Sequence, residues 1–143
     1  MKVSDVMTRD VQTVRPDTTV QEAANFMLRE DAGSMPVRDG DRLIGMITDR
    51  DIAVRGVAKG HGPDTLVRDL MTDEIICAHE DDDVEEVASK MSNAQVRRMP
   101  VIDDNEQLCG IVSLGDLARE GDSESADQAL EGVSEPGGEH QQG

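Results

Sequence analysis

The sequence predicts an α+β fold of two β-α-β-β-α repeats, packed sheet to sheet with pseudo-two-fold symmetry. Three observations lead to this fold: an internal duplication, a helical spacing of apolar residues in each copy, and a hairpin pattern that follows each helix. One copy of about 50 residues would bury too little apolar surface to be stable alone. We therefore expect both copies, within the 143 residues of the chain, to form one core.

The duplication has an offset of 64 residues, which becomes 65 after one extra residue in the second copy. The matching blocks are Val3–Met27 with Val67–Met91, Met35–Val37 with Met99–Val101, and Leu43–Ala53 with Leu108–Ala118. Chance does not produce so many matches in one register. The predicted divisions are a first repeat at residues 1–58, a linker at 59–66, a second repeat at 67–119 and an acidic, disordered tail at 120–143.

A short strand and a helix open each repeat. Val11–Val14 and Ile75–Ala78 are the strand candidates, and hydroxyl or carboxylate residues follow them as helix-start signals. Apolar residues then recur at i, i+3, i+4 and i+7. They are Val20, Ala23, Ala24, Met27 and Leu28 in the first repeat and Val84, Val87, Ala88 and Met91 in the second. This spacing predicts one amphipathic helix in each repeat.

A hairpin and a second helix complete each repeat. Alternating apolar residues on both sides of a polar turn predict the hairpin. The expected strands are Met35–Arg38 and Leu43–Thr48 in the first repeat, and Met99–Ile102 and Leu108–Ser113 in the second. The second helices are expected from about Asp49 and from about Leu114.

The net charge excludes several classes of protein. The chain has 31 acidic and 14 basic residues, a formal net charge of -17, and one aromatic residue, Phe26. Nucleic acids and anionic membranes attract proteins through Lys and Arg, so neither is an expected partner. No apolar run approaches the roughly 20 residues that span a bilayer. The N-terminus shows no secretory signal, which favours the cytoplasm.

The two cysteines indicate free thiols. Cys77 and Cys109 lie outside any CxxC pattern, and a reducing compartment would keep both reduced. Cys77 and His79 alternate on one short strand, which would suit a metal only if Cys109 or His61 joined them. A calcium-loop spacing does not accompany the acidic run at residues 80–86, which we interpret as carboxylates at the positive end of a helix. No metal site is therefore predicted.

The last strand of each repeat ends in a chemically informative pattern. Thr48 and Asp51 in the first repeat, and Ser113 and Asp116 in the second, have the spacing [ST]-x-x-D at the opening of a helix. Free backbone N–H groups there favour an anion, so the hydroxyl can reach a phosphate while the carboxylate accepts from a ribose diol. The same spacing is also a capping box, which needs no ligand.

These patterns together resemble a known family. DVMT, a short strand, MPV and a final Gly-h-h-Thr/Ser-x-x-Asp, where h is an apolar residue, resemble the CBS (cystathionine beta-synthase) domain, and two copies resemble the pair called a Bateman module. The resemblance covers nearly all of residues 1–119. It implies a homodimer and an adenosine-containing ligand in clefts between the repeats: AMP, ADP, ATP, NAD(H) or S-adenosylmethionine.

The resemblance also implies a role for individual residues. Asp51 and Asp116 would hold ribose hydroxyls, and Thr48 and Ser113 would contact phosphate. The implied adenine contacts are Val11, Thr13, Met35 and Pro36 in the first repeat, and Ile75, Cys77, Met99 and Pro100 in the second.

The two repeats differ where basic residues would face the phosphates. Arg97 and Arg98 occupy this place in the second repeat, whereas the first has Gly33 and Ser34 and could use Arg50 instead. A polyphosphate should therefore prefer the cleft that Arg97 or Arg98 lines.

Three functions compete on these observations. The first is a non-catalytic regulatory module that senses an adenine nucleotide, requires no cofactor and passes energy or redox state to an unknown protein partner. The second is a ligand-independent protein that only dimerises and docks a partner. An enzyme with its site in the cleft is the third, but no general base with an activating neighbour can be named, so no catalytic residue is predicted.

Overall fold

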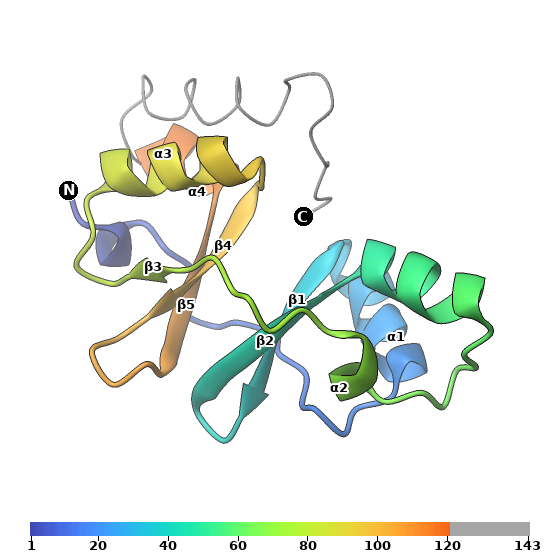
Figure 1. The fold of residues 1–143 in the computed structure, drawn as a ribbon. Coiled ribbons are helices and arrows are strands. Elements are labelled where there is room, and N and C mark those ends of the chain that lie inside the picture. Colours follow the sequence, from blue (N-terminus) through green and yellow to red (C-terminus); the bar gives the residue numbers. More distant parts are fainter. Residues whose placement is uncertain (121–143) are drawn as a thin grey trace. The chain divides into compact units, whose positions relative to one another are not determined.

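The structure is a computed structural model that describes residues 1–120 and divides them into two compact units. Among the described residues, unit 2 is Gln12–Ile75, and unit 1 combines Met1–Val11 with residues 76–120. Both units contain helices and strands, which confirms the α+β class (Figure 1). The predicted acidic tail, apart from Glu120, lies outside the described residues.

The compact units differ from the two sequence repeats in their N-terminal segments. Residues 1–11 belong to the first repeat but pack in unit 1, where Thr8 forms a β-bridge with Ile111. Residues 67–75 belong to the second repeat but pack in unit 2, where Thr72 forms the equivalent bridge with Met46. Each repeat thus gives its opening segment to the last strand of the other repeat.

Unit 1 is built around a three-stranded sheet. Its elements are the 3-10 helix η1 (Val3–Asp5), β3 (Ala78–His79), α3 (Val84–Ala94), β4 (Arg98–Ile102), β5 (Leu108–Ser113) and α4 (Leu114–Glu120). The order is β3-β4-β5, in which β3 is parallel and β5 antiparallel to β4. Helices α3 and α4 lie side by side (Figure 1). The hairpin is the one that the sequence predicts.

Unit 2 repeats this plan with a different second helix. Its elements are α1 (Val20–Glu30), β1 (Ser34–Asp39), β2 (Arg42–Thr48), the π-helix η2 (Asp51–Gly56), the 3-10 helix η3 (Val57–Lys59) and α2 (Val67–Leu70). Strands β1 and β2 are antiparallel, and Gly40 takes a positive φ of 62° in their turn. Val14 adds a parallel bridge to Val37 at the β1 edge.

Helix α3 buries all four of its predicted apolar residues, whereas α1 buries Val20, Ala23 and Met27 and leaves Ala24 and Leu28 exposed. The two helices also start differently. The side chain of Thr19 accepts a hydrogen bond from the Glu22 N–H at 3.2 Å, which caps α1. Asp83 precedes α3 without a side-chain cap. Both helices end at a residue in the left-handed conformation, Asp31 and Gln95.

Three predicted elements differ from the structure. Within Val11–Val14 only Val14 pairs, and in the second repeat pairing is confined to Ala78 and His79. A ladder of one or two residue pairs is shorter than the three or more residues of an ordinary strand. The second helix of the first repeat is the π-helix η2, and η3 follows it directly at residues 57–59. The helical chain therefore extends to the end of the predicted first repeat and includes Lys59, the first residue of the predicted linker.

Each unit has a hydrophobic core of its own in the described residues. The core of unit 1 is centred on Met91, Met99 and Leu117, all fully buried. The core of unit 2 is centred on Met35, Val37 and Ile47. The exchanged opening segments contribute to both: Val3, Val6 and Met7 complete the first core, and Val67 and Leu70 the second. No helix among residues 1–120 has the length and apolar character to cross a membrane.

Candidate functional site

A reciprocal pair of hydrogen bonds joins the hydroxyl and carboxylate residues in each unit. In unit 2 the Thr48 N–H donates to Asp51 Oδ2 and the Asp51 N–H donates to Thr48 Oγ1, both at 3.0 Å. In unit 1 the Ser113 N–H donates to Asp116 Oδ2 at 2.9 Å, and the Asp116 N–H donates to Ser113 Oγ at 3.2 Å. Each pair is a complete capping box that fixes its carboxylate at a helix start.

The two carboxylates differ in exposure. Asp116 has only 6% of its surface exposed, whereas Asp51 is half-buried. An ionised carboxylate offers about four acceptor positions, so one capping bond does not use its full capacity. Both side chains could therefore cap a helix and accept from a hydroxyl pair.

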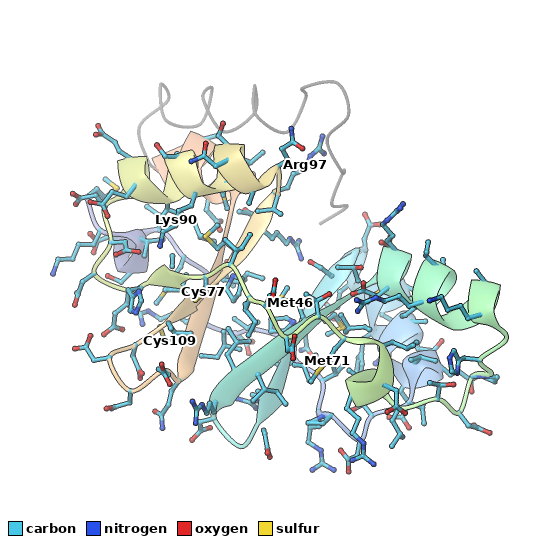
Figure 2. All side chains as sticks on the ribbon, viewed as in Figure 1. Met46, Met71, Cys77, Lys90, Arg97 and Cys109 are labelled. Atoms are coloured by element: carbon cyan, nitrogen blue, oxygen red, sulfur yellow. The ribbon has the colours of Figure 1, made fainter. Side chains whose placement is uncertain are left out.

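Arg97 and Arg98 lie beside the capping box of unit 1. Arg98 pairs with Ser113 across the β4–β5 ladder, and the Arg97 carbonyl accepts the Leu114 N–H at 3.1 Å. Figure 2 shows Arg97 where the chain leaves α3 and enters β4. Its Nε is buried and has no hydrogen-bond partner among residues 1–120. A guanidinium with an unsatisfied buried donor next to a helix start is suited to an anionic oxygen.

Unit 2 has the same backbone geometry without these cations. The Asp49 N–H donates to the Gly33 carbonyl at 2.9 Å, and Ser34 pairs with Thr48. Ser34 is buried with 7% exposure. Arg50, the residue that we considered as a substitute, is exposed within the first turn after Thr48. Gly33 and Ser34 therefore occupy the same backbone positions in unit 2 as Arg97 and Arg98 in unit 1, and the two units differ there in their side chains.

The structure distributes the remaining candidate residues over both units. Thr13 lies next to Pro36, because the following residue, Val14, donates its N–H to the Pro36 carbonyl at 3.0 Å. Cys77 is likewise next to the β3–β4 pairing. Val11 and Ile75, however, fall in different units from Thr13 and Cys77. Unit 2 contains Thr13, Met35, Pro36, Thr48, Arg50, Asp51 and Ile75, and unit 1 contains Val11, Cys77, Arg97, Arg98, Met99, Pro100, Ser113 and Asp116.

Met35 and Met99 are core residues in the structure. They are 2% and 0% exposed and belong to the cores of unit 2 and unit 1. Any contact of these two positions with a base would have to come from backbone atoms, because both thioethers are occupied by apolar packing.

Lys90 is a site neighbour that sequence reasoning missed. Its Nζ donates to the Cys77 carbonyl at 3.2 Å and lies 3.4 Å from Asp82 Oδ2. Burial raises the pKa of the Cys77 thiol, while the positive charge of Lys90 acts in the opposite direction. The sequence does contain a signal for this contact. Lys90 follows the buried Val87 by three residues, which places it on the side of α3 that faces β3. Its counterpart in the first repeat is Phe26, which cannot donate.

The described residues offer little chemistry for a metal or a nucleophile. Residues 1–120 contain no group of three or more His, Cys, Asp or Glu side chains that could hold a metal ion. Burial, reinforced by the nearby Glu80 carboxylate, raises the pKa of the Cys109 thiol to about 11. Cys109 Sγ also lies 3.4 Å from the Val101 carbonyl. A thiol with such a pKa is protonated at neutral pH and is a poor nucleophile.

Comparison with known proteins identifies related sequences. The profile of the CBS domain matches residues 3–56 and 67–123. The CBS domain-containing protein YhcV of Bacillus subtilis is 42% identical over 133 residues, which are 92% of this chain and 94% of YhcV.

Solved structures give the same family and add bound ligands. Hypoxic Response Protein I, solved with two coordinated zinc ions, is 37% identical with a TM-score of 0.77 over 84% of this chain and 98% of that one. The CBS domain pair of MJ0100, in complex with 5'-methylthioadenosine and S-adenosyl-L-methionine, is 32% identical (TM-score 0.72, 83% and 94% covered). CBSX2 in complex with AMP is 27% identical (TM-score 0.73, 82% and 93% covered).

Proposed function

Because the chain belongs to the CBS domain family, we propose that it is a non-catalytic regulatory module that binds an adenosine-containing ligand and passes energy or redox state to a partner protein. The observation that carries this proposal is the repeated hydroxyl–carboxylate pair. Both units hold an Asp at the same place, three residues after a Thr or Ser and at the opening of a helix.

The proposed roles follow from the chemistry of these groups. Asp51 and Asp116 accept from the ribose hydroxyls, and Thr48 and Ser113 lie where helix N–H groups attract a phosphate. Adenosine compounds bound to CBSX2 and to the MJ0100 pair support this class of ligand. Backbone atoms near Pro36 and Pro100 contact the base.

Arg97 gives unit 1 a preference for phosphorylated ligands. Its buried Nε has no partner within the part of the chain that the structure describes, and an acceptor oxygen would satisfy it. Unit 2 has Gly33 at this position. AMP, ADP and ATP should therefore bind unit 1 more tightly than unit 2. Methylthioadenosine has an uncharged methylthio group in place of the phosphate, so Arg97 should not increase its affinity.

Two measurements test the proposal. Mass spectrometry of the denatured protein shows whether a nucleotide is carried through purification, and titration calorimetry of nucleotide-free protein then compares AMP, ATP, NADH and S-adenosylmethionine. We expect at least one of them to bind with an affinity that falls in Asp116→Ala. No binding of any of the four at millimolar concentration, by protein with a normal unfolding transition, would overturn the proposal.

A ligand-independent docking protein is the alternative, and the capping boxes are the observation that favours it. Each box stabilises its helix without any ligand, so the repeated motif has a sufficient structural reason. A homodimer is expected under both proposals. The alternative requires that Asp51→Ala combined with Asp116→Ala leaves partner capture unchanged, with nucleotide present or absent.

A further inference from the structure

Arg55 joins the helix that begins at Asp51 to a segment from the other sequence repeat. Its Nη1 donates to the carbonyls of Leu70 and Met71, both at 3.2 Å. These carbonyls end the short helix α2, where free acceptors favour a cation. The bonds therefore connect η2 to residues 67–72, which we call the crossing segment.

Two further contacts fix the crossing segment within unit 2. A Cβ on Gly56 would lie 2.9 Å from Leu70 Cδ1, so η2 and α2 are in close contact. Met46 and Thr72 exchange two backbone hydrogen bonds of 2.9 Å, next to the position of Met71 (Figure 2). The crossing segment is thus held by η2 on one side and by β2 on the other. The stretch of chain in unit 2 ends at Ile75, three residues after Thr72, and unit 1 resumes at Ile76.

Arg55 has no equivalent in the second repeat. With the offset of 65 that applies here, its counterpart is Glu120, which has no side-chain donor. The second repeat therefore has no arginine at the position of Arg55, and this type of hydrogen bond to a neighbouring segment is specific to the helix that carries Asp51. The local π-helical geometry of η2 distinguishes the same helix from α4.

We propose that Arg55 is a positioning residue that couples the nucleotide site of unit 2 to the crossing segment. This inference rests on the proposed function, because it takes Asp51 as the group that a nucleotide engages. A nucleotide that restricts the motion of Asp51 also restricts the motion of η2. The hydrogen bonds of Arg55 then extend this restriction to the carbonyls of residues 70 and 71. The chain that leads into unit 1 then becomes less mobile when unit 2 is occupied.

Hydrogen–deuterium exchange of the full chain tests Arg55 with AMP as the probe. We compare wild type with Arg55→Met, Arg55→Lys and the control Arg68→Met, which removes an exposed arginine from α2 itself. Without nucleotide, Arg55→Met should speed exchange of the Met46 and Thr72 amides about fivefold, and Arg55→Lys should restore part of the protection. The Arg68→Met control should match wild type.

The arm with AMP separates the two proposals. In wild type, AMP should slow exchange both near Asp51 and in the crossing segment, whereas in Arg55→Met it should slow exchange only near Asp51. Equal AMP protection of the crossing segment in wild type and Arg55→Met overturns the coupling. If AMP does not bind to wild type, the same comparison is made with whichever of ATP, NADH and S-adenosylmethionine binds, and the proposed function fails when none of the four binds. Unchanged exchange in ligand-free Arg55→Met overturns the role of Arg55 by itself.

Discussion

The thioether of Met7 packs directly on the backbone of Gly110. A Cβ on Gly110 would lie 2.5 Å from Met7 Sδ and 2.9 Å from the Thr8 carbonyl oxygen. Met71 and Gly45 repeat the relationship in unit 2, with both corresponding distances at 2.9 Å. The methionine of each opening segment therefore requires a glycine in the last strand of the other repeat.

We predict that Gly110→Ala destabilises the chain by about 1–3 kcal/mol, because the added methyl group overpacks a filled space. Met7 could rotate away, but the Thr8 carbonyl belongs to the β-bridge with Ile111 and cannot move without breaking it. Gly45→Ala should cost less, because its sulfur contact is less severe. Urea unfolding followed by circular dichroism measures both.

Gly62→Ala is the matched control for these two variants. A Cβ at Gly62 meets no atom within 4 Å, and its φ is not positive. Its unfolding midpoint should stay within the error of wild type. A loss in Gly62→Ala equal to that in Gly110→Ala would contradict a steric origin.

Arg97→Met should change ligand affinity and stability in opposite directions. The variant removes a buried donor that has no partner in the described residues, so the chain without nucleotide should be as stable as wild type or more stable by up to about 1 kcal/mol. Affinity for AMP at unit 1 should fall about tenfold, which corresponds to one charge-assisted hydrogen bond. Thermal unfolding and calorimetry measure the two effects.

Adenosine is the control ligand for Arg97→Met. It lacks the phosphate, so its affinity should be the same for the variant and for wild type. A parallel loss for adenosine and AMP would show that Arg97 shapes the site without contacting phosphate. Weaker stability in the ligand-free variant would contradict the unsatisfied state of Nε.

Local patterns predicted most elements of the fold. The apolar spacing of Val84, Val87 and Met91 predicted α3, and the alternation around Asp103–Gln107 predicted the second hairpin. These patterns work because they record which side of a helix or strand is buried. The capping boxes were also predicted, as one of two interpretations of [ST]-x-x-D.

The exchange of the opening segments could not be predicted in this way. Val3 and Val67 are equivalent in the repeat, and either could in principle pack on either core. The outcome depends on the long-range pairing of Thr8 with Ile111 and of Thr72 with Met46, for which periodicity holds no information. The bonds from Lys90 and Arg55 to distant carbonyls were missed for the same reason.

Asp116→Asn should weaken a phosphorylated adenosine ligand more than Asp51→Asn does. Unit 1 combines a carboxylate of 6% exposure with Arg97 and Arg98, and an interaction with a buried carboxylate is less screened by water. Asparagine retains an acceptor for the capping bond, so both variants should keep folded helices. Calorimetry with AMP measures the two affinities, and equal losses would count against the difference between the units.

Thiol alkylation should show the raised pKa of Cys109. In a Cys77→Ser background, the shift from the ordinary value of 9.0 to about 11 reduces the thiolate fraction at pH 8 about hundredfold. The alkylation rate of the folded chain should therefore still rise about tenfold per pH unit above pH 9. The alkylation rate of the same thiol in the urea-unfolded chain should level off there. The raised pKa also makes the stability of the fold depend on pH, because the unfolded chain loses the thiol proton at a lower pH than the folded chain does. This contribution to stability is fully present below pH 9 and is lost as the pH rises toward 11. Restricted access alone would lower the rate equally at every pH, so a profile that levels off near pH 9 in the folded chain would contradict the shift.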